Sequence, residues 1–438
     1  MNWRVLTLLV SLGSGAAQTV PLSTPAPPTV QSALLLNALL LNAQTVFDEG
    51  ARLLKTFYFG FSTVNLDEQI SFYRGQLDRA CRPDLRTCPV SSGDQALKAL
   101  YRSVGDRHLY AMTASEFQAR MESFEAAPQK VSSYGLTLGP TGAQGALVLD
   151  VLTGSAAEQA GILPGDLLAL PDGQPLPFSL GEQPTLELLV RHGSQQRAVT
   201  LTRSEVYPAA LPSLYTPADA PAGVLVLRIP SFAFTERVGP KVHELVKQAQ
   251  RQGAAALIVD LRRGPGGSNY ECEMAAAAFT GPFEYQDQTQ RGTFRGGWTG
   301  NISLDVAERV FFDVSVPVTQ QHLAYALKEP ASWQGKTVVL VDARSASCHE
   351  YMAYFMQQKG IPVLGEQTGG LMNTASILMP LPGGSGVALP AVRSAHPDGT
   401  LYPAFLTPDV PVSPDWRGMA DGQPDPMLQK AFEVLQKP

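Results

Sequence analysis

VVLVDARSASCHEYMAYF, residues 338 to 355, is the stretch that indicates the fold. Branched apolar residues run to Asp342, a short polar turn follows, and a helical pattern begins near Ser347. Ser347 with Glu350 three residues later fits a capping box, which is an ordinary way to begin a helix. A helix start also offers free N–H groups, so that a serine there with the N–H of Cys348 is half of an acyl-transfer site. The spacing alone leaves both interpretations open.

A similar strand, turn and helix pattern lies upstream in LIVDLRRGPGGS, residues 257 to 268. The N–H groups of a glycine turn before a helix can hold an anion or a developing oxyanion. A nucleotide-binding loop would need Lys followed by Ser or Thr after the glycines, or the spacing G-x-G-x-x-G, and neither is present. A plain turn between a strand and a helix is the competing interpretation.

Strand and helix patterns alternate around these two turns. GVLVLRI (223–229) is strand-like, KVHELVKQAQRQG (241–253) is helical, and IPVLGE (361–366) is again strand-like. Two strand-to-helix units of this kind predict an α/β layer with a largely parallel sheet. DPMLQKAFEVLQK (425–437) predicts a terminal helix.

The earlier part of the chain has two other patterns. From about Ala33 to Phe124 the apolar spacing is helical, which predicts a small helical domain. From about Val131 short β-like runs follow, with a short helix and a turn in SAAEQAGILPGDLLALPDG (155–173). Because 438 residues are long for one core, two or three domains are expected. We therefore predict a multidomain α/β protein that is α+β overall.

The composition is that of an ordinary folded protein, with 44% hydrophobic residues and a net charge of −6. Neither a nucleic-acid binder nor an acidic disordered chain has such a balance. The basic residues are scattered, so that no patch favours a phosphate backbone or a membrane surface.

The first residues, MNWRVLTLLVSLGSGAAQT, hold one positive charge, a short apolar run and then small residues. This order predicts a secretory signal over residues 1–17, and a buried amino-terminal segment is the alternative. The apolar run is too short to span a bilayer, which needs about 20 residues. A proline-rich tether over residues 18–32 follows. We expect a secreted or periplasmic protein without stable membrane insertion.

Export permits disulfides, and Cys81 with Cys88 bracket a short polar segment that a bridge would close. The state of Cys272 and Cys348 stays open, and four free thiols are the alternative. Four scattered cysteines give no metal-ligand spacing, and the two His-Glu pairs lack the second His of H-E-x-x-H. We therefore predict no metal and no cofactor.

ALYRSVGDRHLYAM, residues 99 to 112, places His108 in a polar break after a predicted helix. A histidine in such a break is freer to act as a base than one on an apolar face. A surface or capping role is the more common use of such a position.

In this order, the motifs resemble those of the C-terminal processing peptidase family of serine proteases, which includes tricorn-like members. The resemblance covers about residues 33 to 412. SASCHE is similar to the family's Ser-Ala-Ser-Ala-Ser-Glu, in which the middle serine, here Ser347, is the nucleophile. The other matching segments are VGDRH (104–108), IVDLRRGPGG (258–267), LGEQTGG (364–370) and LTPDVPV (406–412).

The resemblance implies three domains. They are a helical domain at 33–128, a PDZ domain at 129–206, and a serine peptidase core of the ClpP/crotonase-like type at 207–438. In the PDZ-like part, the loop with Tyr134, Gly135 and Leu136 would bind the carboxylate of a chain end that adds as a strand. A clamp that holds no substrate is the alternative.

The resemblance also implies the base. The better-known bacterial and plastid members use a lysine after the serine, at a position that Leu371 or Met372 occupies here. A serine–lysine dyad of that kind cannot form. The tricorn-like branch uses an upstream histidine instead, which implies Ser347 as nucleophile and His108 as base.

The remaining members of the site follow from the same resemblance. The oxyanion donors would be the backbone N–H of Cys348 and that of Gly266 or its neighbour Gly267. The family's glutamate, which orients the histidine, falls near Tyr402, which is not acidic. The candidates for a third catalytic residue therefore stay open, and they are Asp398, Asp106 and Glu350.

We expect an exported serine endopeptidase that cleaves unfolded or C-terminally recognised polypeptides through an acyl-enzyme. Polypeptides are the expected partners, and nucleic acids are not. A catalytically inactive PDZ-containing peptide-binding protein on the same fold is the alternative, supported by the missing lysine and acid. An esterase without peptide specificity is a third option. The natural substrate, the oligomeric state and any regulation by the PDZ domain stay open.

Overall fold

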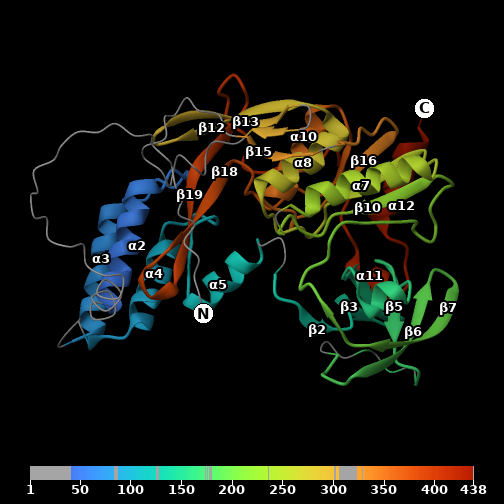
Figure 1. Ribbon diagram of the computed structural model, residues 1–438, viewed down its shortest axis with the longest axis horizontal. Helices are drawn as coiled ribbons and strands as arrows, with labels where there is room; N and C mark the ends of the chain where they lie inside the picture. The colour runs from blue at the N-terminus through green and yellow to red at the C-terminus, as the bar shows by residue number, and fades with distance from the viewer. Residues whose placement is uncertain are drawn as a thin grey trace, which may run out of the picture. The chain divides into compact units, whose positions relative to one another are not determined.

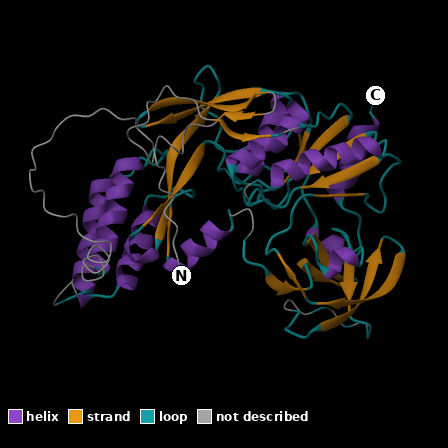
Figure 2. Ribbon diagram, viewed as in Figure 1, coloured by secondary structure: helices purple, strands orange, loops and turns teal. Residues whose placement is uncertain are grey.

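The computed structural model describes residues 41–437, except 83–86, 125–127, 173, 175, 177–179, 235, 300–301, 305–322 and 328. The described residues from Asn42 onward belong to one compact unit. The predicted signal (1–17), the tether (18–32) and residues 33–40 of the predicted helical domain lie outside the described residues. Figures 1 and 2 show the arrangement of helices and strands.

The first described elements are helices, in the places where apolar spacing predicted them. They are α2 (Ala43–Phe57), α3 (Leu66–Ala80), α4 (Val90–Ser103) and α5 (Ala114–Glu122). Side chains of Asn42 and Thr113 cap α2 and α5. A disulfide between Cys81 and Cys88 links the ends of α3 and α4. The first three helices share one apolar core.

A five-stranded antiparallel sheet follows, in the order β3-β4-β5-β6-β7. Its core includes Tyr134, Leu168 and Leu188. Its strands are β3 (Leu136–Gly142), β4 (Gly145–Val151), β5 (Leu167–Ala169), β6 (Thr185–His192) and β7 (Gln195–Thr202), with the short helix α6 (Ala156–Gln159) after β4. The strands β2 (Val131–Ser133) and β8 (Ser204–Val206) pair with each other, so that the chain enters and leaves this antiparallel part at neighbouring positions.

A six-stranded sheet forms next, in the order β20-β17-β16-β11-β10-β9. Its neighbours run parallel except for β9 against β10, as the alternating strand and helix patterns predicted. The strands are β9 (Ser213–Tyr215), β10 (Val224–Arg228), β11 (Ala256–Asp260), β16 (Lys336–Val341), β17 (Val363–Gly365) and β20 (Val410–Pro411).

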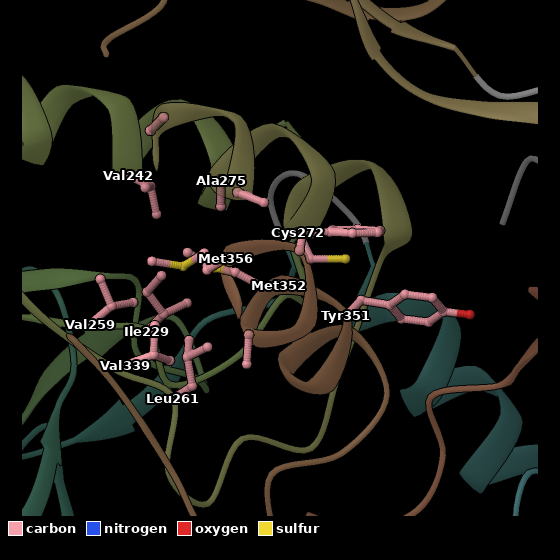
Figure 3. Close-up of a cluster of buried hydrophobic side chains, with 14 of the residues drawn as sticks. Ile229, Val242, Val259, Leu261, Cys272, Ala275, Val339, Tyr351, Met352 and Met356 are labelled. Atoms are coloured by element: carbon pink, nitrogen blue, oxygen red, sulfur yellow. The ribbon is translucent and has the colours of Figure 1, made fainter. Parts of the chain in front are cut away.

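Helices cover both faces of this sheet. One face packs against α7 (Val238–Arg251), α8 (Asn269–Thr280) and α10 (Cys348–Gln358), and the other against α12 (Pro426–Gln436). Strand residues alternate between the faces, so that Val259 meets the first group and Ile258 meets α12. Figure 3 shows the first interface, where Met352 and Cys272 from the helices meet Val259 from the sheet. The result confirms a mixed α/β protein.

A second large sheet is antiparallel, and the apolar patterns did not predict it. Its order is β1-β19-β12-β13-β14-β15, with β18 also paired to β19. The strands are β1 (Tyr110–Met112), β12 (Phe283–Thr289), β13 (Gly292–Thr299), β14 (Ile302–Leu304), β15 (Leu323–Ala326), β18 (Thr374–Pro380) and β19 (Gly386–Ala395). Tyr110 pairs with Ala388, so the segment around His108 is tied to strands from the far end of the chain.

Two shorter helices complete the described elements, η2 (Pro382–Gly384) and α11 (Trp416–Ala420). The helix α11 packs on the five-stranded sheet through Ala420, which lies in one cluster with Leu147 and Leu167. None of the described helices is both long enough and apolar enough to cross a membrane.

Candidate active site

The two turns singled out in the sequence lie side by side. Strands β11 and β16 are parallel neighbours, and the carboxyl ends of such strands meet at the same edge of a sheet. The N–H of Ala346 donates to the carbonyl of Gly264 at 2.9 Å, which joins the turn after β16 to the turn after β11. The sheet therefore brings the glycine turn against the serine turn.

Ser347 is the N-cap of α10 and has an unusual backbone conformation. Its φ is 54° and its ψ is −120°, in the left-handed half of the map that non-glycine residues avoid. Its N–H donates to Glu350 Oε2 at 2.7 Å, so the capping box predicted from the sequence is present. The capping box does not by itself explain this strained backbone. Strain at a serine that begins a helix therefore supports the hypothesis that Ser347 has a catalytic function.

The neighbouring serine, Ser345, has a structural role. It is fully buried, and its hydroxyl donates to the carbonyl of Leu261 at 3.0 Å. The same hydroxyl accepts the N–H of Asp342 at 3.0 Å. Ser345 therefore ties the ends of the two strands together, which leaves Ser347 as the candidate nucleophile of the pair.

The glycine turn before α8 comes close to other backbone. A Cβ on Gly267 would lie 2.2 Å from the carbonyl carbon of Phe232, and the φ of Gly267 is 150°. A Cβ on Gly266 would lie 3.2 Å from the hydroxyl oxygen of Ser347. The glycines thus let the backbone approach both the segment around Phe232, which follows β10, and the candidate nucleophile.

His349 holds this turn in place. Its Nδ1 accepts the N–H of Gly266 at 3.1 Å, which leaves Nε2–H to donate to the carbonyl of Ile229 at 3.1 Å. Burial lowers the pKa of His349 to about 3, so the ring is neutral and both nitrogens are used. His349 is therefore not the base, although it lies in the serine turn.

The contact with His349 also corrects one oxyanion assignment. The N–H of Gly266 is already used by the imidazole, so it is not the free donor that the resemblance implied. The N–H groups of Gly267 and Cys348 stay as the predicted donors.

His108 is positioned through its own backbone and that of its neighbours. Asp106 Oδ1 accepts its N–H at 2.9 Å, and the hydroxyl of Ser376 donates to its carbonyl at 2.9 Å. The guanidinium of Arg107 donates to the carbonyl of Gly369, in the loop that follows β17. These contacts hold the histidine segment against β18 and against the loop that follows the serine helix in sequence.

The side chain of His108 is buried, and burial lowers its pKa to about 4. The negative charge of Asp106 raises that pKa, and the positive charge of Arg107 lowers it, but both effects are smaller than the effect of burial. At neutral pH the ring is therefore neutral and can accept a proton.

Nδ1 of His108 lies 2.6 Å from the hydroxyl oxygen of Thr374, the first residue of β18. Sequence reasoning missed this residue, because nothing local marks a buried threonine at a strand start as a partner of a distant histidine. Of the acids considered, Asp106 contacts the backbone of His108, and the exposed Asp398 accepts the N–H of Thr400 at 2.9 Å.

Glu350, the third acid considered, is buried and binds loop backbone. It accepts the N–H of Ser347 at 2.7 Å, of Gly370 at 2.8 Å and of Leu371 at 2.9 Å, as well as the hydroxyl of Thr368. Burial raises its pKa, and these hydrogen bonds oppose that rise. Glu350 therefore fixes the loop that follows β17.

Ser347 and His108 line the same cavity, which has a volume of about 470 Å³. Gly267, two residues before the start of α8, also lines this cavity. Apolar side chains in and just after α5 and in β18 form much of the remainder, and they are Met121, Phe124, Ala375, Ile377 and Leu378. No cluster of three or more His, Cys, Asp or Glu that could hold a metal ion occurs among the described residues.

Cys272 and Cys348 are free thiols buried beside this cavity. The thiol of Cys348 donates to the carbonyl of Gly267 at 3.4 Å, and that of Cys272 to the carbonyl of Asn269 at 3.2 Å. The thiol of Cys348 therefore links the serine helix to the glycine turn, whereas the contact of Cys272 lies within α8.

The predicted peptide-binding loop lies next to a second cavity, of about 360 Å³, lined by Tyr134, Leu136 and Arg203. Tyr134 is buried, and its hydroxyl donates to the carbonyl of Gln183. The N–H of Gly135 donates to the hydroxyl of Ser133 at 3.0 Å. A carboxylate bound there would therefore have to compete with Ser133 for that donor.

Comparison with known proteins relates this chain to a family of peptidases. The model of peptidase family S41 matches residues 223–412. Carboxyl-terminal-processing peptidase 2, chloroplastic, of Arabidopsis thaliana is 25% identical over 351 residues, which are 75% of this chain. The chain spans 62% of the length of that relative.

One solved structure supports a similar fold. The "Putative S41 protease" of Bacteroides fragilis NCTC 9343 has a TM-score of 0.52 at 14% identity, over 88% of this chain and 96% of that chain. The photosystem II D1 C-terminal processing protease has a TM-score of 0.48 at 19% identity, over 91% of this chain and 98% of that chain.

The family match extends from the last residue before β10 to just beyond β20. It includes the parallel sheet, the glycine turn and the serine turn, which are the parts of the site that lie on the core. Residues 223–412 therefore match peptidase family S41, and this part of the chain is similar to the peptidases of that family.

Proposed function

We propose that this protein is a serine endopeptidase in which Ser347 is the nucleophile and His108 the general base. One observation carries the proposal. Ser347 has a strained backbone at a helix start, and it lines one cavity with a buried, neutral histidine from far upstream. A nucleophile beside a base in a mostly apolar cavity is the arrangement that acyl transfer requires.

The proposed reaction has two halves. The hydroxyl oxygen of Ser347 attacks the scissile carbonyl while Nε2 of His108 takes its proton, and that proton then passes to the leaving amine. The N–H groups of Gly267 and Cys348 donate to the oxyanion of the tetrahedral intermediate. Water then attacks the carbonyl of the acyl-enzyme while His108 takes its proton, and that proton passes to the Ser347 oxygen as the ester bond breaks and the carboxylic acid product leaves.

We propose that the substrates are unfolded polypeptides or chains held by their carboxyl terminus. The five-stranded sheet with α6 supports a PDZ domain over residues 129–206, beside a helical domain at 33–128 and a peptidase core of the ClpP/crotonase-like type at 207–438. The carboxyl-terminal processing in the name of the plant relative agrees with this substrate class. Residues 1–17 support export to a secreted or periplasmic location.

The test combines cleavage with chemical labelling of the nucleophile. Purified protein is incubated with denatured casein, and separately with a fluorophosphonate that phosphonylates activated serines, with mass spectrometry to locate the adduct. The variants are Ser347→Ala and, as a matched control, Ser91→Ala, an exposed serine on α4. We expect casein cleavage and an adduct on Ser347 in the wild type and in Ser91→Ala, and neither in Ser347→Ala.

A second candidate function, peptide binding without catalysis, is favoured by one observation. His108 has a neutral hydroxyl, not a carboxylate, at Nδ1. If the wild type neither cleaves casein nor forms an adduct, while a peptide with a free carboxyl terminus binds, this second function replaces the first.

A further inference from the structure

The hydrogen bond between His108 and Thr374 orients the imidazole of the proposed base. The Nδ1–Oγ1 distance is 2.6 Å, and Thr374 and His108 are 4% and 9% exposed. Pairing of Thr374 with Arg393 on β19 fixes the start of β18, and Ser376 two residues on donates to the carbonyl of His108. The same strand therefore holds both the ring and the backbone of the histidine.

The direction of this hydrogen bond decides whether His108 can act. A neutral imidazole carries one hydrogen, on Nδ1 or on Nε2. Only when Nδ1–H donates to the Thr374 oxygen does Nε2 keep the lone pair that can take the serine proton. The imidazolium formed in the reaction donates from both nitrogens, so the threonine oxygen must also be the acceptor at that stage.

We propose that Thr374 is the positioning residue of His108, in the role that a carboxylate plays in a Ser-His-acid triad. Ser347, His108 and Thr374 then form a reaction centre without an acidic member. The inference rests on the proposed function, because it assigns a role to the partner of the proposed base.

The acids nearby have other hydrogen bonds that explain their positions. Asp106 accepts the N–H of His108 with one oxygen and the hydroxyl of Tyr58 with the other, at 2.9 Å each. Its carboxylate thus positions the backbone of the histidine and not Nδ1. Glu350 is used by the loop after β17, as described above.

The charges around His108 come from several elements. Asp106 and Arg107 flank it in sequence, and their effects on its pKa oppose each other. Strand β18 and helix α10 present the neutral hydroxyls of Thr374, Ser376 and Ser347. The other charged or titratable groups that line the cavity are Arg120 of α5, Asp287 of β12, Tyr110 of β1 and Tyr270 of α8.

A neutral partner has a measurable consequence. A hydroxyl orients the ring but stabilises the imidazolium less than a carboxylate would, so that burial dominates and His108 stays neutral in mild acid. We expect the acid limb of kcat/KM to have its midpoint near pH 4, and not near the unperturbed value of about 6.5.

The experiment compares three substitutions of one residue on a peptide substrate derived from casein. Thr374→Val keeps the shape and removes the hydroxyl, Thr374→Ser keeps the hydroxyl, and Thr374→Asp supplies a carboxylate. We expect Thr374→Val to lower kcat by roughly 10- to 100-fold at unchanged KM, because the buried Nδ1–H loses its acceptor. Thr374→Ser should stay within a few-fold of the wild type, and Thr374→Asp should move the acid limb to higher pH.

A second measurement does not depend on activity. In protein with ¹⁵N-labelled imidazoles, the nitrogen shifts of His108, assigned with His108→Gln, report which nitrogen carries the hydrogen. At pH 6 we expect Nδ1–H in the wild type and a mixture of tautomers in Thr374→Val. Nε2–H in the wild type overturns the proposal even if no variant cleaves peptide.

The outcomes separate this inference from the proposed function. If Ser347→Ala is inactive but folded Thr374→Val has the kcat and acid limb of the wild type, Thr374 has only a structural role and the inference is wrong. If the wild type is inactive yet His108 carries its hydrogen on Nδ1, the orientation stands and the peptidase assignment fails.

Discussion

The segments that carry His108 and His349 both reach the neighbourhood of Ser347, and they hold their imidazoles in opposite ways. His349 lies in the first turn of α10 and uses one nitrogen for the N–H of Gly266 and the other for the carbonyl of Ile229. His108 contacts the hydroxyl of Thr374 through Nδ1, and it lines the cavity.

Burial lowers the pKa of both histidines, so the direction of the pKa shift does not distinguish the structural histidine from the proposed base. The hydrogen-bond partners of the two rings do distinguish them. A ring with both nitrogens on backbone groups cannot transfer a proton without breaking the structure around it. The histidine beside the proposed nucleophile in sequence is thus the structural one, and the distant histidine is the proposed base.

The largest effect should follow from removing the base. His108→Gln keeps much of the side-chain volume but cannot act as base, and we expect it to lower kcat/KM on denatured casein by about a thousandfold. Its melting temperature should stay close to that of the wild type, because the loss is chemical. A folded His108→Gln with wild-type kcat/KM would remove His108 from the mechanism.

At His349 we expect the opposite result, a loss of stability with activity largely kept. His349→Ala leaves the N–H of Gly266 and the carbonyl of Ile229 without partners, which should lower the free energy of unfolding by about 2 to 5 kcal/mol. His349→Asn places an acceptor near the position of Nδ1 and is the matched control, with a smaller loss. Urea unfolding measures both variants.

The activity of the His349 variants sharpens the comparison. The folded fraction of each should keep kcat/KM within about tenfold of the wild type, since the predicted donors Gly267 and Cys348 stay in place. The structural role is refuted if His349→Ala is as stable as the wild type but inactive.

Acid should destabilise the protein through both histidines. Each has a pKa below its usual value in the folded state, so the unfolded chain binds protons first as the pH falls. The stability is complete above about pH 6.5 and decreases toward the folded pKa values of about 4 and about 3. At pH 5 each histidine should lower the free energy of unfolding by about 2 kcal/mol.

Urea unfolding between pH 7.5 and pH 5 measures this loss, and His349→Asn is the control. It should have a shallower dependence on pH than the wild type because it lacks one of the two groups. Equal slopes for the two proteins would show that His349 titrates in the folded state as it does in the unfolded chain.

The smallest effect on kcat/KM is expected at Asp398, one of the three acids that the sequence left open as the third catalytic residue. Asp398 is exposed and contacts the N–H of Thr400, so Asp398→Asn should change kcat/KM less than twofold. Asp106→Asn is the matched comparison, with a loss of about tenfold, because Asp106 positions the backbone of His108. A large loss of kcat/KM in Asp398→Asn would make that carboxylate a candidate for the third catalytic residue again.

Much of the core could be predicted because its patterns are local. The apolar runs that became β10, β11 and β16 and the helical runs that became α7, α10 and α12 are visible in short windows. The glycine turn and the serine turn were visible for the same reason. Their meeting at one sheet edge depends on β11 and β16 being neighbours, and the prediction of a largely parallel sheet did not specify that order.

The antiparallel sheet could not be predicted in this way. Strand β1 has three residues, and its pairing of Tyr110 with Ala388 depends on chain segments that no local pattern connects. The partner of His108 was hidden for the same reason, since Thr374 is placed by β18 and β19. The use of the Gly266 N–H by His349 likewise depends on two turns from different strands.

Resemblance to a known family indicated Ser347 and His108 as the candidate pair, and the sequence by itself determined the alternation of strands and helices and the two turns. Those features depend on the order of residue types over a few turns of chain. Only the tertiary structure decided that Ser345 and His349 are structural, that Gly266 is not a free donor, and that Thr374 faces the proposed base. A hydrogen-bond partner is a matter of distances between atoms, and folding sets those distances across segments that the sequence keeps far apart.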